Sequence, residues 1–256
     1  MNKTTDGQID LSGKNILVTG ASKGIGAGIA KHLAACGATV LVNYATSGDG
    51  AKKVVSEIVS AGGKAVAIGA DVSKLADVDR LFAEAAKTVG RIDVLVNNAG
   101  RFEPAPLDTV SEENFRRNFD TNVLGLIFAT RKAVSQFGDQ GGVIVNIGSA
   151  IVRSPMSAFL TYGASKAAAD YVTKALAVEL GPKKVRINSV QPGLVDTEGV
   201  RAVGSFQKDV VDMVVSRTPL GRPGQPQDIA SVVAFLASDA AGWLTGELVG
   251  ATGGLH

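Results

Sequence analysis

The sequence predicts an α/β fold, with one doubly wound domain, a parallel sheet of about seven strands and helices on both faces. Short apolar runs alternate along the chain with longer segments in which apolar residues recur at helical spacing. The short runs are apolar at successive positions, which is typical of strands that helices cover on both sides. Strands separated by helices indicate right-handed β-α-β crossovers.

The first half of the chain shows this alternation clearly. A helical pattern that includes Ile25 and Ile29 follows the first apolar run and ends at Gly37, a natural helix stop. A later helix ends at Gly62 for the same reason. We expect strands at 15–19, 39–43, 65–68 and 94–97, and helices at 25–36, 50–61 and 75–89.

The second half has longer helices, the first of which begins at Ser111, a residue suited to an N-cap. We expect helices at 111–137, 158–180 and 228–237, and strands at 143–147, 185–190 and 247–249. No stretch has the composition of an interdomain linker. We therefore expect a flexible segment at 1–11 and a single domain at 12–256.

Composition and charge limit the function classes. Of 256 residues, 45% are hydrophobic and 20% are charged, as in ordinary globular proteins. A net charge of +2 gives no reason to expect nucleic acid or a membrane surface as a partner. The longest apolar run, 232–237, is far shorter than the ~20 residues that span a bilayer. The polar N-terminus lacks a signal-peptide core, so we expect a cytoplasmic protein.

Cysteine and histidine point to no special chemistry. Cys36 is the only cysteine, so no intrachain disulfide can form, and its place in a helical pattern favours a small buried apolar residue. His32 and His256 have no metal-like spacing to other ligands, so we expect no metal centre.

A glycine-rich loop follows the first expected strand and opens the first helix. Its pattern is TGxxxGxG from Thr19 to Gly26, which departs from GxGxxG because position 29 is Ile29. Glycines allow close approach to a pyrophosphate, and the helix N-terminus offers N–H groups. A structural turn is the alternative. The position between strand and helix favours a dinucleotide site at Gly20, Ser22, Lys23, Gly24, Ile25 and Gly26.

Tyr162 and Lys166, with Ser149 thirteen positions before Tyr162, carry most of the chemical information. A separation of four residues places Tyr162 and Lys166 one turn apart on one helix face. Because a close ammonium favours the ionised phenol, we expect the Tyr162 pKa to lie below its ordinary value of ~10. With the Ser149 hydroxyl, the pair forms a proton-transfer site of the kind that hydride chemistry needs. The alternative is a solvated lysine beside a half-buried tyrosine.

Together these motifs resemble the short-chain dehydrogenase/reductase family, and the resemblance extends from about Ser12 to Gly254. They stand in that family's order: TGxxxGxG, NNAG at 97–100, Asn122, Ser149, Tyr162, Lys166 and Pro192-Gly193. The resemblance implies a Rossmann-type fold and a nicotinamide cofactor. Within the family the chain looks like the bacterial carbonyl reductases, the 3-oxoacyl-carrier-protein reductases and the sugar dehydrogenases.

The resemblance also implies cofactor contacts and residue roles. Asp71 would bind the adenine ring, although it also suits the N-cap of the helix near Leu75. Asn98 would have a structural hydrogen-bonding role, and Asn122 would hold a water that links Lys166 to solvent or would bond only backbone groups. The implied contacts outside the glycine loop are Asp71, Val72, Asn98, Ala99, Gly100, Tyr162, Lys166, Pro192, Gly193, Val195 and Thr197.

The end of the second strand predicts NADP(H). An acidic residue at this place binds the ribose hydroxyls of NAD and repels a 2′-phosphate. Here no carboxylate occurs before Asp49, and Lys23 adds a cation, unless it is merely solvated. An amide, hydroxyls and a cation suit a phosphate. The expected contacts at this end are Lys23, Asn43, Tyr44, Thr46 and Ser47.

In the mechanism that the resemblance implies, NADPH gives a hydride to a carbonyl carbon and Tyr162 donates a proton to the oxygen. Lys166 would lower the Tyr162 pKa and bond the nicotinamide ribose, and Ser149 would hydrogen-bond the substrate oxygen. A non-catalytic NADP-binding protein is less favoured because all three residues are present.

Two stretches should shape the substrate pocket, at 150–160 and at 197–219, the second of which resembles the family's mobile lid. Apolar side chains there line a cavity or pack in the core: Ile151, Val152, Met156, Phe159, Val203, Phe206 and Met213. The expected substrate contacts are Ser149, Ile151, Met156, Tyr162 and Phe206.

We expect a reductase of free ketones or aldehydes. Few basic residues follow Arg131-Lys132 to dock an acidic carrier protein, so 3-oxoacyl-thioester reduction is the alternative, together with sugar 1-dehydrogenation. The resemblance implies a homotetramer built on the two long helices. An apolar face fits such an assembly or the internal core: Val123, Leu124, Ile127, Phe128 and Val134.

Overall fold

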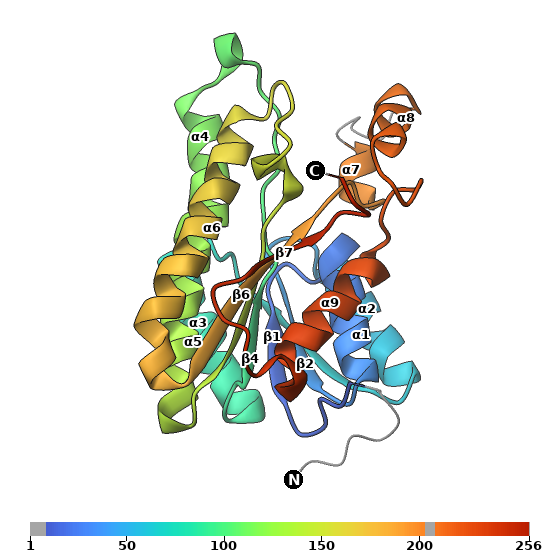
Figure 1. The fold of residues 1–256 in the computed structure, drawn as a ribbon. Helices are drawn as coiled ribbons and strands as arrows, with labels where there is room; N and C mark the ends of the chain where they lie inside the picture. Colours follow the sequence, from blue (N-terminus) through green and yellow to red (C-terminus); the bar gives the residue numbers. More distant parts are fainter. Residues whose placement is uncertain (1–8, 203–207, 256) are drawn as a thin grey trace.

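A computed structural model of the protein describes residues 9–202 and 208–255, which form a three-layer α/β/α fold (Figure 1). Seven strands of this part of the chain pair in the order β3-β2-β1-β4-β5-β6-β7, each pair parallel. The predicted doubly wound Rossmann-type fold is therefore confirmed. The strands are β1 (Asn15–Val18), β2 (Thr39–Tyr44), β3 (Lys64–Gly69), β4 (Val94–Asn97), β5 (Gly142–Ile147), β6 (Val185–Pro192) and β7 (Leu248–Ala251).

Helices cover both faces of the sheet and bury two separate cores (Figure 1). Ile16 and Val18 of β1 face the core under α1, α2 and α9, whereas Leu17 faces the core under α3, α5 and α6. Burial on both sides explains why the strands are apolar at successive positions. The covering helices are α1 (Gly24–Ala35), α2 (Gly48–Ser60), α3 (Leu75–Val89), α5 (Leu126–Phe137), α6 (Leu160–Leu180) and α9 (Pro226–Ala237).

The helix expected at 111–137 has a wider turn in its middle. α4 (Glu112–Phe119) and α5 flank a π-helical segment, Asp120–Gly125. The Ser111 hydroxyl accepts a hydrogen bond from the Asn114 N–H at 3.1 Å and so caps α4, as the sequence suggested. Single π-turns are rare in proteins, and those that occur are often found at functional sites. This one carries Asn122.

Two regions differ from the expectation. Leu11 is 1% exposed and its N–H donates to the Cys36 carbonyl at 2.8 Å, so packing begins within the segment 1–11 that we expected to be flexible. Apolar Ile9 and Leu11 supply that packing inside an otherwise polar segment. The expected lid at 197–219 contains two short helices, α7 (Glu198–Ala202) and α8 (Lys208–Ser216), which the sequence analysis did not predict.

The sheet topology positions the site. The strand order reverses between β1 and β4, so chain segments leave these neighbouring strands toward opposite faces. In doubly wound sheets ligands bind in the crevice that opens there, at the carboxyl ends of the strands. Within residues 9–202 and 208–255, no helix combines the length and apolar character needed to cross a membrane.

Candidate active site

A cleft of about 530 Å³ follows the carboxyl ends of the strands. Loops after β1 to β6 form its walls, together with the start of α6 and residues of α7 and α8. The residues that the sequence predicted as cofactor contacts all line this cleft, with the exception of Tyr44. The Tyr44 ring packs against Gly48 and Gly69 instead.

The predicted substrate contacts fall into two groups. Ser149, Ile151, Met156 and Tyr162 line the cleft. Phe206, like the neighbouring Val203, lies outside the described residues. Of the other apolar side chains that the sequence suggested, Phe159 and Met213 line the cleft and Val152 does not.

The glycine loop forms a tight backbone cradle. Gly20 and Gly24 have φ values of +62° and +57°, a conformation that favours glycine. A Cβ added to Gly20 would lie 2.8 Å from the Ala99 Cα, and one added to Gly26 would lie 2.5 Å from the Gly20 carbonyl oxygen. No side chain caps the N-terminus of α1. Its first N–H groups and its positive dipole end therefore suit an anion.

Two asparagine side chains hold this loop in place. Asn43 Oδ1 accepts from the Gly20 N–H at 3.3 Å, and Asn43 Nδ2 donates to the Ile68 carbonyl at 3.2 Å. Asn98 Nδ2 donates to the carbonyls of Thr19 and Gly20 at 2.8 and 2.9 Å. Both amides are thus engaged with the backbone, and their role is to shape the loop.

Asp71 does not cap α3, which corrects one of the two interpretations of this residue. The N-cap of α3 is Lys74, and no side chain caps that helix. Asp71 Oδ1 instead accepts from the Ser73 N–H at 3.1 Å and from its hydroxyl at 2.7 Å, because two residues is the spacing of an Asx turn. Asp71 and Val72 line the cleft.

The fold brings Ser149, Tyr162 and Lys166 together. Ser149 follows β5, and the other two lie one turn apart in α6. The Ser149 hydroxyl accepts from the Ile151 N–H at 3.2 Å, and it lines the cleft together with Tyr162. Lys166 is 6% exposed; its Nζ lies 5.9 Å from the centre of the Tyr162 ring and donates to the Ile147 carbonyl at 2.7 Å.

The electrostatics of this group differ from the prediction for Tyr162. Burial raises the pKa of the Tyr162 phenol above its ordinary value, and the neighbouring Ser149 hydroxyl lowers it by less. We expected Lys166 to lower this pKa, but it is not among the causes of the shift, and its ammonium donates to the Ile147 carbonyl. Burial also lowers the pKa of Lys166 to about 8, while the charge of Asp170 acts in the opposite direction.

Asn122 joins the segment after β4 to α6. Its Oδ1 accepts from the Arg101 N–H at 2.8 Å, and its Nδ2 donates to the Arg101 carbonyl at 2.9 Å and to the Ser165 hydroxyl at 2.8 Å. A Cβ at Gly100 would lie 3.3 Å from Asn122 Oδ1 and 3.6 Å from Lys166 Nζ. Asn122 thus lies near Lys166, and its side chain bonds a side-chain hydroxyl as well as the backbone groups that one of the two interpretations named.

Asp170 is a buried acid that the sequence analysis missed. It lies one turn after Lys166 in α6 and is 5% exposed. Its carboxylate accepts from the Ser189 hydroxyl at 3.3 Å and from Gln191 Nε2 at 2.6 Å. A Cβ at Gly148 would lie 3.1 Å from Asp170 Oδ1, so the carboxylate supports the turn after β5. The spacing of four residues from Lys166 was the available signal.

Phe102 is the second residue that the sequence analysis missed. It follows β4 and lines the cleft next to Tyr162, with ring centres 5.4 Å apart and planes at 80°. Its only sequence signal is its position two residues after Gly100, which itself lines the cleft.

The segment after β6 forms another wall of the cleft. Val195 is buried and pairs with Gly224 in an isolated β-bridge. The Thr197 hydroxyl accepts from the Val200 N–H at 3.3 Å, at the start of α7. A Cβ at Gly24 would lie 3.5 Å from the Thr197 side chain, so this segment approaches the glycine loop.

Comparison with known proteins places this arrangement in a family. A family model described as enoyl-(acyl carrier protein) reductase matches residues 20–256. An uncharacterized oxidoreductase of Methylorubrum extorquens is 50% identical over 246 residues, which cover 96% of this chain and 99% of the relative.

Solved structures agree. A short-chain dehydrogenase/reductase from Serratia marcescens is 37% identical with a TM-score of 0.89 over 96% of this chain and 98% of that one. A 7α-hydroxysteroid dehydrogenase complexed with NADH and 7-oxo glycochenodeoxycholic acid is 34% identical with a TM-score of 0.93 over 98% of both. The angucycline C-6 ketoreductase LanV with bound NADP is 36% identical with a TM-score of 0.89 over 96% of both. The chain belongs to the short-chain dehydrogenase/reductase family, whose members are oxidoreductases.

Proposed function

We propose that this protein is an NADPH-dependent reductase that converts a ketone or aldehyde to an alcohol, reversibly, with Tyr162 as the general acid and base. The observation that carries the proposal is the convergence of Ser149, Tyr162 and Lys166 on one cleft with the glycine loop. A proton donor, a second hydroxyl and a buried cation there suit a carbonyl oxygen that gains negative charge.

The cleft fits a dinucleotide. A Cβ at Gly20 or Gly26 would fill the cradle under the pyrophosphate, and the uncapped N-terminus of α1 offers N–H donors. A bound nicotinamide would supply the hydride in reduction and accept it in oxidation. Val195 and Thr197 line the same cleft, and the resemblance implies that they bind the nicotinamide carboxamide.

The residues would divide the proton transfer between them. In reduction Tyr162 gives its proton to the substrate oxygen while the carbonyl carbon gains the hydride, which yields the alcohol. Its raised pKa keeps the phenol protonated at neutral pH, as a proton donor must be. Ser149 donates to the same oxygen, and the cationic Lys166 stabilises the phenolate until it is protonated again from solvent.

Three residues support NADP(H) over NAD(H). Thr46 and Ser47 line the cleft after β2, and Lys23 lines it from the glycine loop. The next carboxylate along the chain, Asp49, is exposed and pairs with Lys52 at 3.4 Å instead of lining the cleft. A 2′-phosphate would thus meet a cation and two hydroxyls without repulsion.

Steady-state kinetics with both cofactors test this preference. We expect a higher kcat/KM with NADPH than with NADH, and Lys23→Ala should raise the KM for NADPH with little effect on NADH. Lys52→Ala, an exposed cation outside the cleft, is the control. Equal efficiencies with both cofactors in the unaltered protein would refute the preference.

A substrate panel tests the reaction class, namely small ketones and aldehydes, an acetoacetyl thioester and an aldose. We expect the free carbonyl compounds to be the better substrates. A docked acidic carrier protein would need free cations near Arg131 and Lys132. Lys132 already pairs with Asp79 at 2.6 Å, and Arg131 stacks on the Phe128 ring at 4.3 Å. A higher kcat/KM for the thioester or for the sugar would contradict the proposed reaction and favour that alternative.

A further inference from the structure

Three aromatic rings meet at the substrate side of Tyr162. Phe102, after β4, stacks on Phe159, just before α6, with ring centres 5.3 Å apart and planes at 16°. The Tyr162 ring stands edge-on to both, 5.4 Å from Phe102 at 80° and 6.3 Å from Phe159 at 69°. Both phenylalanines are half-buried and line the cleft, so part of each ring remains accessible.

The backbone fixes this stack. Ala158, directly before Phe159, has φ +68°, a left-handed conformation that costs a non-glycine residue about 1–3 kcal/mol. Its carbonyl accepts from the Ala105 N–H at 2.7 Å, which joins the two loops that carry the phenylalanines. The Phe159 carbonyl accepts from the Gly163 N–H at 2.8 Å and joins the stack to α6. A strained residue held by such contacts indicates a position under functional constraint.

The cleft that contains the stack also has apolar side chains from two other segments. From the segment 150–160 and from α8 these are Ile151, Met156, Val210, Met213 and Val214, and the polar Ser154 and Arg217 line the cleft as well. Thioether and aliphatic groups pack well against a flat apolar ring.

We propose that Phe102 and Phe159 form a stacking platform, and that the substrates preferred by this enzyme are ketones whose carbonyl is attached to, or part of, a flat fused aromatic ring system. This inference rests on the proposed function and adds the substrate class. Because the stack touches Tyr162 edge-on, a ring laid on it would bring its attached carbonyl near the phenol. Aromatic rings prefer such offset-stacked arrangements, which contribute beyond the area that they bury.

Two matched ketones separate ring stacking from apolar burial, namely 2-acetylnaphthalene and its fully saturated decalin counterpart. The saturated compound is at least as hydrophobic but has no π face. We expect the protein loaded with NADP⁺ to bind the naphthyl ketone roughly tenfold more tightly in calorimetry. The ratio of kcat/KM values should favour the naphthyl ketone by a similar factor.

Phe102→Leu and Phe159→Leu should reduce this preference toward one, while each variant keeps an apolar side chain. Phe115→Leu is the matched control, because Phe115 stacks on Phe119 at 4.2 Å in α4 but does not line the cleft. Equal binding of the two ketones, or a preference unchanged in both variants, overturns the platform. Preferential binding without turnover of either ketone would retain the platform and count against the proposed function alone.

Discussion

At the scale of single residues, the pKa values of Tyr162 and Lys166 are set by burial and by neighbouring polar and charged groups. Burial raises the pKa of Tyr162 and lowers that of Lys166, so both groups shift toward their neutral forms. The charge of Asp170 acts against the effect of burial on Lys166, because it raises the lysine pKa. Asp170 also bonds Ser189 and Gln191, so it is held at this place by β6. The charge of Lys166 therefore depends in part on a buried carboxylate one turn away.

This balance predicts the pH dependence of reduction. Lys166 is a cation below its pKa of about 8 and neutral above it, so kcat should fall as pH rises through about 8. Asp170→Asn removes the carboxylate that raises this pKa, and the fall should move to lower pH. Glu179→Gln, an exposed change in the same helix, should leave it in place. A pH profile that is the same in Asp170→Asn and the unaltered protein would show that Asp170 does not tune Lys166.

At the scale of elements, the glycine loop and the π-turn place the reacting groups. The loop is packed so closely against Asn98 and Ala99 that two of its positions have no space for a Cβ. The π-turn carries Asn122, which joins the segment after β4 to Ser165 in α6. The first feature fixes the glycine loop by close packing, and the second joins the segment after β4 to α6 through hydrogen bonds.

Gly26→Ala should therefore damage the loop. The added methyl would lie 2.5 Å from the Gly20 carbonyl oxygen, and overpacking of this kind costs about 1–3 kcal/mol. We expect lower unfolding free energy in urea and weaker NADPH binding. Gly181→Ala is the control, since nothing lies within 4 Å of its added methyl and its φ is not positive. Equal losses in the two variants would mean that loop packing is not the cause.

Much of the element pattern could be predicted because it follows from local signals. Continuous apolar runs gave the strands, and glycines marked the helix ends. The π-turn at Asp120–Gly125 has no such signal, since it differs from an α-helix only in hydrogen-bond register. Asp170 and Phe102 escaped for a related reason, because their roles come from neighbours distant in sequence, Gln191 and Phe159.

The Tyr162 pKa was predicted in the wrong direction because sequence spacing reports a nearby charge but not burial. The four-residue separation correctly brought Tyr162 and Lys166 to one place. It could not show that the ammonium bonds the Ile147 carbonyl or that the phenol loses solvent. The orientation and the burial of a side chain are set by the tertiary structure.

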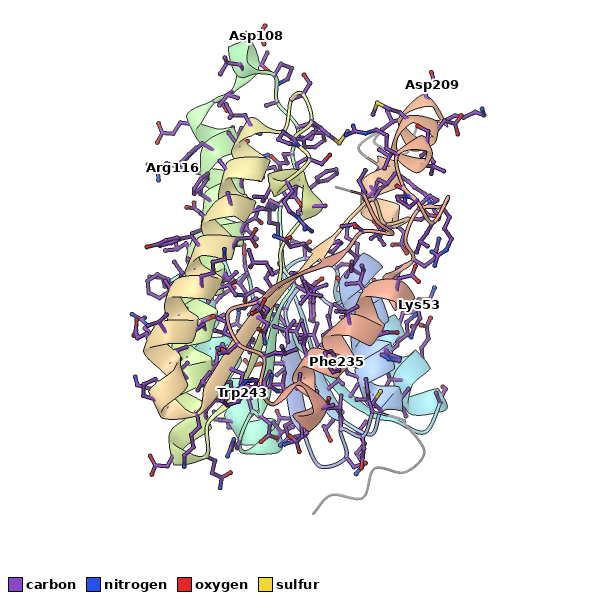
Figure 2. The ribbon with its side chains drawn as sticks, in the orientation of Figure 1. Lys53, Asp108, Arg116, Asp209, Phe235 and Trp243 are labelled. Atoms are coloured by element: carbon purple, nitrogen blue, oxygen red, sulfur yellow. The ribbon has the colours of Figure 1, made fainter. Side chains whose placement is uncertain are left out.

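At the scale of the whole molecule, large apolar side chains remain exposed on the outer helices. On α5 and the turn before it, Leu124 and Ile127 point outward, whereas Phe128 and Val134 pack partly on the core. The sequence left open whether this apolar face packs in an assembly or in the core. In the structure, part of it is exposed and part of it packs on the core. On α6, Tyr171 is 74% and Val178 82% exposed. Figure 2 shows Trp243, which is 99% exposed, in the chain after α9.

We propose that these faces join copies of the chain in a homotetramer. Sedimentation should then give four times the chain mass of 26.2 kDa. Val178→Glu should lower that mass by placing a charge in an apolar contact. Val59→Glu, at a 54% exposed apolar position on α2, is the matched control and should not change it. A monomer in the unaltered protein would contradict the assembly without affecting the proposed chemistry.

In the proposed reaction the Tyr162 hydroxyl transfers the proton during carbonyl reduction. The most direct measurement is kcat for a reducible ketone with NADPH in Tyr162→Phe, combined with NADPH affinity by fluorescence titration. Tyr171→Phe, an exposed tyrosine in the same helix, is the matched control. We expect Tyr162→Phe to lose at least about 10²-fold in kcat, the low end for a general acid, with NADPH affinity retained and Tyr171→Phe unaffected. Full turnover by Tyr162→Phe would show that the Tyr162 hydroxyl is not the proton donor.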